Sequence, residues 1–342
     1  MPNKTINITY EASAPTRIDL AGGTLDIWPI YVLENGGLTI NVAINRRARA
    51  RLKIRPDSKI LIESKDINAK IEFANISRIS HEKISIVTRI VQYFCPNFGF
   101  ELETETGLPL GTGLAASSSL GIALMHLFNA LTERGLDEKQ IIYILSNIEA
   151  QTIGVNSGKQ DYYPATYGGF NAIRFECDGD YNEKIPLSDT FLRKLNDSFV
   201  LCFTGRSHFS ATNNWTMLKR YIENDGATRA SMAKIKHIAS KMYEALKNED
   251  FDAFANLIEE EGHIRVGLAE DVLTPQMIRI IDKAKKSGAI ASKPLGAGGG
   301  GYMLFVCEGG VKPSIIKAIE QIGAKNLNFE FEDKGVSISV IN

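Results

Sequence analysis

Short stretches that alternate apolar and polar residues dominate the first half of the chain, and this period of two is typical of β-strands. The stretches lie at 5–10, 37–44, 48–54, 70–73, 100–104 and 168–175. Apolar residues at helical spacing predict helices at 84–94, 114–133 and 137–153. The helix expected at 137–153 begins at Asp137 and Glu138, acidic residues that suit a helix amino terminus.

The second half is mainly helical in its pattern. Helices are expected at 210–223, 227–247, 250–262, 274–287 and 313–321, with a strand at 302–307 and two short strands near the end. Strands and helices interleave in both halves, which predicts an α+β protein with two lobes. The polar stretch Cys177–Glu183 indicates the boundary, so we expect domains at 1–180 and 181–342.

Glycines and hydroxyl residues precede the helix expected at 114–133. The segment reads Pro109-Leu-Gly-Thr-Gly-Leu-Ala-Ala-Ser-Ser-Ser-Leu120. Glycines allow several backbone N–H groups to converge on one anion, and the following helix adds the positive end of its dipole. The segment lacks the lysine of the Gly-x-x-x-x-Gly-Lys-Ser/Thr loop, and Ala116 breaks a Gly-x-Gly-x-x-Gly dinucleotide loop. It predicts a phosphate loop, although a tight strand-to-helix connection has a similar composition.

Composition excludes several classes of partner. The 342 residues carry a formal charge of −1, which offers no electrostatic footprint for nucleic acid or an anionic membrane. The arginines of Arg46–Arg51 alternate with alanine, as on the solvated face of a strand. No charge occurs between Thr106 and Thr132, but the apolar part is shorter than the roughly 20 residues of a membrane span.

The cysteines and the amino terminus indicate a cytoplasmic protein. Cys95, Cys177, Cys202 and Cys307 have no paired spacing and lie among apolar neighbours, which predicts buried reduced thiols. The first residues, Met1–Thr5, lack the apolar core of a signal peptide.

Three segments resemble the motifs of the GHMP kinase superfamily in order and spacing. They are Ala14–Asp26, Pro109–Leu120 and Lys293–Gly301. The resemblance implies a ribosomal protein S5 domain 2-like first lobe, a ferredoxin-like second lobe, and a monomer or homodimer. It also implies an ATP- and Mg²⁺-dependent kinase for a small molecule. The residues expected at the nucleotide are Pro109, Gly111, Thr112, Gly113, Leu114, Ala115, Ala116, Ser117 and Ser118.

Within that superfamily, Glu149–Phe170 is similar to the corresponding segment of heptose-phosphate kinases and, more distantly, of galactokinase. The resemblance implies that Asp161 faces the attacking hydroxyl and that Arg17 lies near it and the transferred phosphoryl group. It implies that Ser117 and Glu149 hold magnesium. It places the following residues at the sugar substrate: Asp26, Gly22, Gly23, Gly298 and Gly299.

Two departures from the family pattern affect the choice of substrate. The usual loop reads Gly-Leu-Gly-Ser-Ser, whereas this chain has Gly113-Leu-Ala-Ala-Ser117. Galactokinases carry Gly-Glu-His where this chain has Ala21-Gly22-Gly23, as in the heptose kinases. We therefore expect a heptose phosphate as substrate, with a hexose or deoxyhexose 1-kinase as the alternative. The two alanines in the loop also leave open a nucleotide-binding regulator on the same scaffold.

Each candidate also has a structural interpretation. Arg17 could pair with Asp19 within the strand, and Glu149 could be an exposed helix charge. Asp161 could cap the short helix that follows it, and Asp26 could close a turn. Four weaker expectations concern other segments. The glycine run 296–301 is expected to pack on the phosphate loop, and Trp28 to lie in the core. The run Glu259–Glu261 is expected to be solvated. Arg206, Ser207, His208 and Ser210 are expected in a loop that is either a binding loop or solvated.

Overall fold

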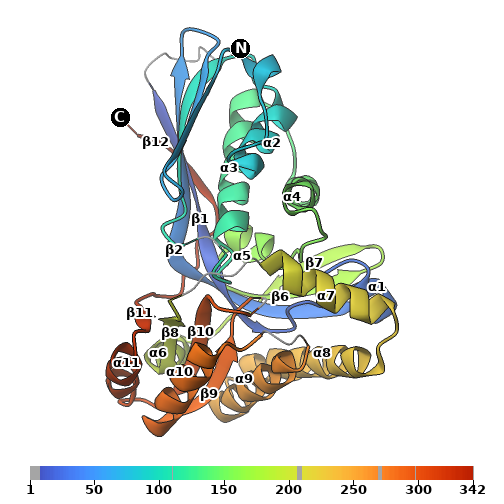
Figure 1. Ribbon diagram of the computed structural model, residues 1–342, viewed down its shortest axis with the longest axis vertical. Coiled ribbons are helices and arrows are strands. Elements are labelled where there is room, and N and C mark those ends of the chain that lie inside the picture. The colour runs from blue at the N-terminus through green and yellow to red at the C-terminus, as the bar shows by residue number, and fades with distance from the viewer. Residues whose placement is uncertain (1–7, 110, 206–209, 269–271, 297, 342) are drawn as a thin grey trace.

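A computed structural model describes residues 8–109, 111–205, 210–268, 272–296 and 298–341, except for the side chains of 210–213. Two long strands, β1 (Thr9–Ala21) and β2 (Gly37–Arg55), run through the upper part of the molecule and reach the second lobe below. The fold is the expected two-lobed α+β arrangement (Figure 1).

The first lobe is built on an eight-stranded sheet within the described residues, with β12-β1-β2-β5-β3-β4 as its main path and β6 and β7 joined through β2. The pairs are antiparallel except for β3 with β5. The further strands are β3 (Ile60–Ser64), β4 (Ala69–Phe73), β5 (Gly99–Glu105), β6 (Phe170–Glu176), β7 (Gly179–Lys184) and β12 (Ser337–Ile341).

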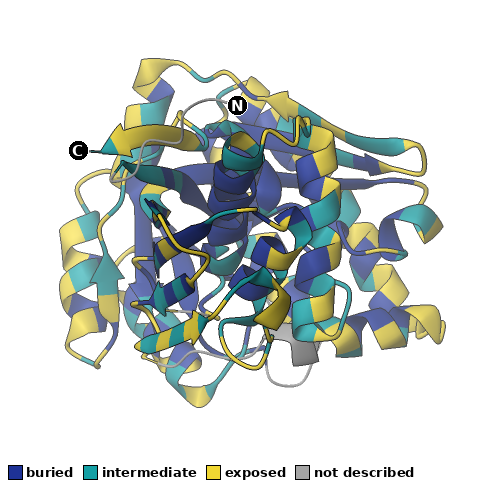
Figure 2. Cartoon of the chain, turned by 90° about the horizontal axis from the view of Figure 1, so that it is seen from above, coloured by how far each residue is buried: buried dark blue, intermediate teal, exposed yellow. Residues whose placement is uncertain are grey.

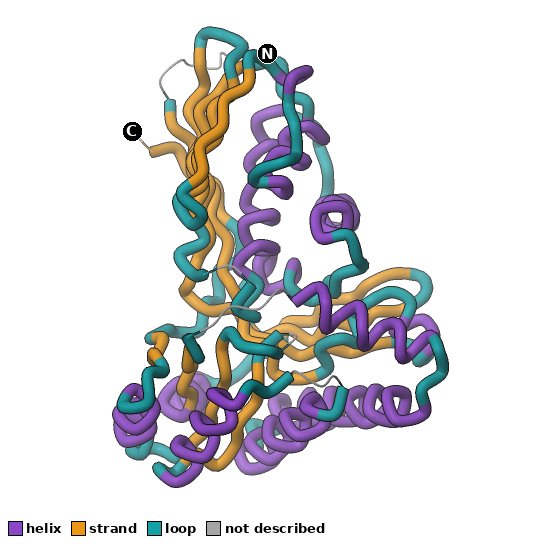
Figure 3. The backbone as a smooth tube through the Cα atoms, viewed as in Figure 1, coloured by secondary structure: helices purple, strands orange, loops and turns teal. Residues whose placement is uncertain are grey.

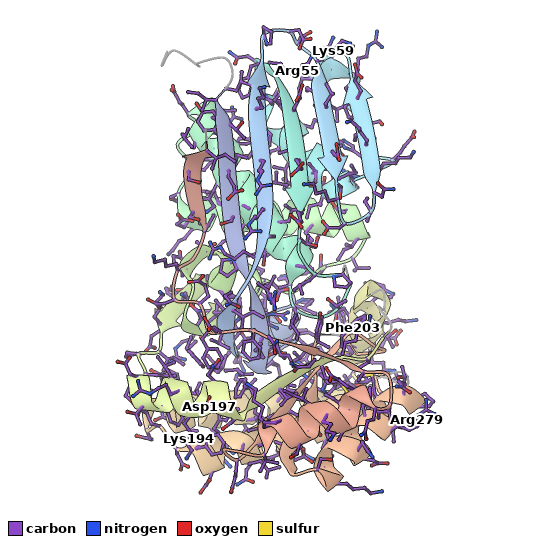
Figure 4. All side chains as sticks on the ribbon, turned by 90° about the vertical axis from the view of Figure 1, so that its left-hand side faces the viewer. Arg55, Lys59, Lys194, Asp197, Phe203 and Arg279 are labelled. Atoms are coloured by element: carbon purple, nitrogen blue, oxygen red, sulfur yellow. The ribbon has the colours of Figure 1, made fainter. Side chains whose placement is uncertain are left out.

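Helices cover one face of this sheet, and the other face is open in the upper part of the molecule. They are α1 (Ile30–Leu33), a 3₁₀ turn (Ile76–Arg78), α2 (Ser85–Phe94), α3 (Ala116–Thr132), α4 (Glu138–Ile153) and α5 (Tyr162–Tyr167). Helix α3 packs on β1 and β2, with α2 and α4 outside it (Figure 1). The opposite face carries polar side chains; Arg55 and Lys59 lie at its far end, and Lys194, Asp197 and Arg279 lie on the second lobe (Figure 4).

The second lobe contains a four-stranded antiparallel sheet in the order β11-β8-β10-β9. In chain order this is 4-1-3-2, the ferredoxin-like arrangement that was expected. Its elements are α6 (Asp189–Ser198), β8 (Phe199–Phe203), α7 (Ser210–Ile222), α8 (Gly226–Lys247), α9 (Phe251–Val266), α10 (Pro275–Lys286), β9 (Ala289–Pro294), β10 (Tyr302–Cys307), α11 (Lys312–Glu320) and β11 (Lys325–Leu327).

The two lobes share their core at the lower end of the long strands. Helix α8 packs on β2 and α9 packs on β1, below the sheet in Figure 3. Every residue of 37–44 in β2 is therefore buried, whereas 48–55 alternates between buried and more exposed positions. The view from above shows this buried centre surrounded by exposed helix faces (Figure 2).

The structure differs from the sequence predictions in how strands join. The two strands expected at 37–44 and 48–54 are one continuous strand, β2. Only the end of the strand expected at 5–10 lies within the described residues, and β1 continues through Pro15 to Ala21. A boundary at residue 180 would cut β7, and β12 pairs with β1 in the first sheet, so these positions of the domain limits do not follow the sheets.

The expectation for the cysteines is correct in part. Cys202 and Cys307 are buried free thiols, whereas Cys95 and Cys177 are exposed, also as free thiols. Cys95 ends α2, and Cys177 lies between Glu176 and Asp178 in the tight connection between β6 and β7, so both are at positions that the fold leaves exposed. Among the described helices, none has the length and apolar character that crossing a membrane requires.

Candidate active site

A pocket of about 410 Å³ lies where the phosphate loop, β1, the start of α5 and the glycine run of the second lobe meet. Most of the predicted site residues line it: Arg17, Asp26, Gly111, Thr112, Gly113, Ala115, Ala116, Ser117, Ser118, Glu149, Asp161 and Gly298. Residues that are far apart in sequence thus form one site with both acidic and basic groups.

The phosphate loop presents an uncapped helix start to this pocket. Ala115 precedes α3 in the left-handed conformation, with φ 63°, and none of the described side chains caps the helix. The first helical hydrogen bond runs from the Ser119 N–H to the Ala115 carbonyl, so the preceding N–H groups of the first turn have no partner within the helix. Ala115 and Ser117 line the pocket, so this end of the helix can receive an anion.

The glycine run of the second lobe packs on the phosphate loop, as expected from the sequence. The Tyr302 N–H donates to the Thr112 carbonyl at 2.9 Å. A Cβ atom added at Gly296 would lie 2.7 Å from the Gly113 Cα, and one at Gly301 would lie 2.5 Å from the Thr112 oxygen. Side chains at these positions would separate the two walls of the pocket.

Arg17 joins Asp161 to the phosphate loop. Its Nε and Nη2 donate to Asp161 Oδ1 at 2.9 and 2.6 Å, and its Nη1 donates to the Gly113 carbonyl at 2.5 Å. These contacts replace the alternative pairing with Asp19. The Asp161 side chain makes no capping hydrogen bond to α5. Burial raises the pKa of Asp161, and the charge and hydrogen bonds of Arg17 oppose that rise.

Glu149 is buried at the side of the pocket and not an exposed helix charge. The Ser118 hydroxyl donates to its carboxylate at 3.1 Å, and the Tyr162 hydroxyl donates to it at 2.5 Å. Burial raises the pKa of Glu149 to about 7. Among the described residues, the hydroxyl next to Glu149 is that of Ser118. Ser117, which the family pattern indicates, lines the pocket.

The oxygen atoms of Glu149 and the neighbouring loop serines suit a magnesium ion that also binds phosphate oxygens. Mg²⁺ in such sites takes one or two carboxylates from the protein and completes its shell with phosphate oxygens and water. Glu149 and the serine hydroxyls supply ligands of that type. Within the described part of the chain, no group of three or more His, Cys, Asp or Glu side chains is arranged to hold a metal by itself.

Asp26 connects two loops that line the pocket. Its carboxylate accepts from the Thr24 N–H at 3.0 Å and from the Gln160 N–H at 2.9 Å. Burial raises the pKa of Asp26 to about 6. Its first contact closes a turn, as the structural interpretation suggested, and its second ties that turn to the segment that carries Asp161.

Five predicted site residues are not part of the described pocket lining: Pro109, Leu114, Gly22, Gly23 and Gly299. A Cβ added at Gly22 would meet the Leu38 carbonyl oxygen, and the Gly299 N–H donates to the Val272 carbonyl. These glycines allow close backbone packing. Trp28, expected in the core, is 57% exposed. Residues 206–209 and the side chain of Ser210 lie outside what the structure describes.

Sequence reasoning missed a group of buried charges beside the pocket. Arg265 from α9 and Asp19 from β1 line it, and Glu261 and Lys293 lie behind them with no exposed side-chain surface. The expectation that Glu259–Glu261 is solvated is wrong for Glu261, because α9 turns that side chain toward the first lobe. The spacing of Glu261 and Arg265, four residues apart on one helix, was the available signal.

Comparisons with known proteins agree with this geometry. The model of the GHMP kinase N-terminal domain matches residues 85–169, and that of the GHMP kinase C-terminal domain matches residues 242–325. D-glycero-alpha-D-manno-heptose 7-phosphate kinase from Campylobacter jejuni is 30% identical over 96% of this chain and 98% of its own length. The chain belongs to the GHMP kinase family.

Solved structures of this family have the same fold. The crystal structure of a D-glycero-D-manno-heptose 1-phosphate kinase from Bacteroides thetaiotaomicron has a TM-score of 0.80 and 25% identity, covering 97% of this chain and 99% of that one. Lactococcus lactis galactokinase, complexed with galactose, has a TM-score of 0.75 at 18% identity, covering 96% and 95%. GHMP sugar kinases use ATP as phosphate donor, so this enzyme is an ATP-dependent phosphotransferase that acts on a sugar hydroxyl.

Proposed function

We propose that this kinase transfers the γ-phosphoryl group of ATP to a hydroxyl of a heptose phosphate, in the presence of Mg²⁺ and in the cytoplasm. The observation that carries the proposal is the side chain of Arg17, which contacts both Asp161 and the Gly113 carbonyl of the phosphate loop. One cation thus lies between a carboxylate that can accept a proton and a loop that can receive a nucleotide.

In the proposed mechanism the protein mainly positions groups. The first-turn N–H groups of α3 and the loop from Gly111 bind the phosphates, because they are donors without helical partners. Asp161 orients the acceptor hydroxyl and takes its proton as the new O–P bond forms and ADP leaves. Arg17 favours the ionised form of that carboxylate, against the effect of burial, and offers positive charge to the moving phosphoryl group.

The metal corner supplies charge stabilisation. Glu149 and a loop serine, Ser118 by its contact or Ser117 by the family pattern, would hold Mg²⁺. When bound there, the ion would neutralise phosphate charge and align the phosphates. Tyr162 fixes the Glu149 carboxylate, because its hydroxyl donates to Oε2.

The polar side chains that line the rest of the pocket suit a phosphoryl acceptor with several hydroxyl groups. Thr24, Ser157, Gln160 and Asn214 face the pocket there. The Gln160 Oε1 is buried without a hydrogen-bond partner in the described structure, so it can accept from a sugar hydroxyl. The heptose 7-phosphate and 1-phosphate kinases among the relatives favour a heptose phosphate, and the absence of the galactokinase Gly-Glu-His sequence at Ala21–Gly23 agrees.

A coupled assay of ADP release with MgATP tests the proposal. The panel contains D-glycero-D-manno-heptose 7-phosphate, the 1-phosphate, the free heptose, galactose and fucose. We expect the highest kcat/KM with a heptose phosphate. Turnover of free hexoses only would replace the proposal by a hexose 1-kinase, which relatives named galactokinase and fucokinase support. Nucleotide binding without turnover of any sugar would favour a regulator.

A further inference from the structure

Four buried charged side chains join the two lobes beside the pocket. Asp19 comes from β1 of the first lobe, Glu261 and Arg265 come from α9, and Lys293 comes from β9. The Arg265 guanidinium contacts Asp19 at 3.2 Å and Glu261 at 3.0 Å, and the Lys293 ammonium contacts Glu261 at 2.9 Å and Asp19 at 3.4 Å. At most 4% of any of these side chains is exposed, so the two acids and two bases form a neutral, desolvated group.

Asp19 is a potential competitor of Asp161 for Arg17. Residues 17 and 19 lie two apart in a regular part of β1, where their partners on β2 are Ala43 and Asn41, so their side chains leave the same face of the strand. Asp19 and Arg17 both line the pocket. The charge of Arg17 acts on Asp19, after those of Lys293 and Arg265, to lower the pKa of Asp19 against the effect of burial.

Arg265 is the positively charged partner of Asp19. It is the base that donates to Asp19 Oδ2, while Lys293 also serves Glu261 and the Leu20 carbonyl. Without Arg265, the single ammonium of Lys293 would face two buried carboxylates. A buried carboxylate without a partner is strongly unfavourable, so another cation would be drawn toward it. Arg17 is the further cation that acts on Asp19 among the described residues.

We propose that Arg265 is a positioning residue that occupies Asp19 and thereby leaves Arg17 in contact with Asp161 and the phosphate loop. The second lobe, through this one side chain, determines which of two carboxylates on the first lobe the pocket arginine contacts. This inference rests on the proposed roles of Arg17 and Asp161. It adds a residue on α9 to the machinery, together with a reason why two acidic residues near one arginine do not compete.

A crystal structure of Arg265→Met tests the proposal without any substrate. Methionine has a similar length and no charge, so it fills the space without pairing with Asp19. We expect the Arg17 guanidinium to move from Asp161 to Asp19. If Arg17 keeps its contact with Asp161 in that variant, the proposal is wrong, whatever sugar the enzyme phosphorylates.

Kinetics of a double variant provide a second test. In Arg265→Met, we expect kcat to fall by about 10- to 100-fold, because a misplaced arginine disturbs the attack geometry, with little change in the KM for ATP. Asp19→Asn removes the competing charge, so Arg265→Met/Asp19→Asn should recover most of the lost kcat. Asp19→Asn alone should reduce kcat less than Arg265→Met does. Arg265→Lys, which keeps the charge, should lie between wild type and Arg265→Met.

The outcomes separate this inference from the proposed function. Loss of kcat in Arg265→Met without recovery in the double variant would show that Arg265 has another role, and it would overturn the proposal. If Arg265→Met does not fold, Arg265→Lys and the double variant, which lacks the unpaired acid, still provide the comparison. If wild type phosphorylates no sugar, the proposed function fails, but the position of Arg17 in the crystal still decides the inference.

Discussion

The open face of the first sheet and the space between the lobes both contain ion pairs built from the same residue types. On the open face, Arg51 contacts Glu11 and Glu103, and the Lys59–Glu72 pair is 52% exposed at both side chains. Between the lobes, Lys293 and Glu261 have no exposed surface. Exposed pairs contribute about 0–1 kcal/mol, whereas removal of one partner of a buried pair leaves an uncompensated charge. The degree of burial of an ion pair therefore determines how strongly its loss affects stability.

The largest effect is expected from a neutral replacement in the pocket beside the buried charges. Asp161→Asn keeps the shape of the side chain but removes the proton acceptor and the ion pair with Arg17. We expect ADP release to slow by about 10²–10⁴-fold, the usual contribution of a general base. The melting temperature, measured in parallel, identifies any loss due to unfolding. Near-full turnover would exclude Asp161 as an essential base.

A matched pair of lysine substitutions tests the comparison directly. Lys293→Met should destabilise the protein by about 3–5 kcal/mol, because Glu261 and Asp19 then share one cation. Lys59→Met, on the open face, should change stability by less than about 1 kcal/mol. The measurement is denaturant unfolding of both variants at one pH. Equal effects in the two variants would contradict the contrast between the two regions.

The pH dependence of stability tests the buried carboxyl of Glu149. Its pKa of about 7 in the folded protein lies above the ordinary value of 4.5, so the folded state binds the proton more tightly. In the absence of metal, the protonated Glu149 carboxyl contributes fully to the stability of the fold below pH 4.5, and this contribution is lost as pH rises toward and through 7. In EDTA, the free energy of unfolding of Glu149→Gln should change less with pH than that of wild type. At pH 8 the variant should be more stable than wild type by roughly 3 kcal/mol. An identical slope in wild type and variant would show that Glu149 titrates normally.

The smallest expected effect concerns the loop at the edge of the buried region. Ala115 has φ 63°, a conformation that costs an alanine more than a glycine. Ala115→Gly should therefore stabilise the protein by up to about 1 kcal/mol. Ala130→Gly, at an exposed position in the same helix, should destabilise it by about 1 kcal/mol. Thermal unfolding compares them, and the same sign in both would show that Ala115 is not strained.

The sequence predicted the open face of the first sheet and the lining of the pocket better than the buried charges between the lobes. The alternation in Arg46–Arg51 correctly indicated a solvated strand face, because local period determines which side a strand residue faces. Glycine spacing indicated the loop, and the family resemblance indicated Arg17, Glu149 and Asp161, which do line one pocket. Helical rotation brings the Ser118 hydroxyl to Glu149. The magnesium contact expected for Ser117 stays a prediction.

The buried charges could not be recognised from local patterns. Asp19 and Arg265 are 246 positions apart, and Glu261 follows two other glutamates on a helix, a pattern typical of a solvent face. Their burial depends on how α9 docks against β1, which is a property of the assembled lobes. The continuity of β2 was missed for the same reason: Asn45 and the arginines after it interrupt the apolar period, but pairing with β1 carries the strand past them.

Strand β12 has a consequence for the order in which the protein assembles. It pairs with β1 on the side opposite β2, so an edge of the earliest strand stays unpaired until residues 337–341 have left the ribosome. The nascent first lobe must therefore wait through synthesis of the entire second lobe with hydrogen-bonding groups exposed along β1. An open edge of this kind is a template for pairing with other chains. A chain stalled before β12 should thus aggregate more readily than the finished protein.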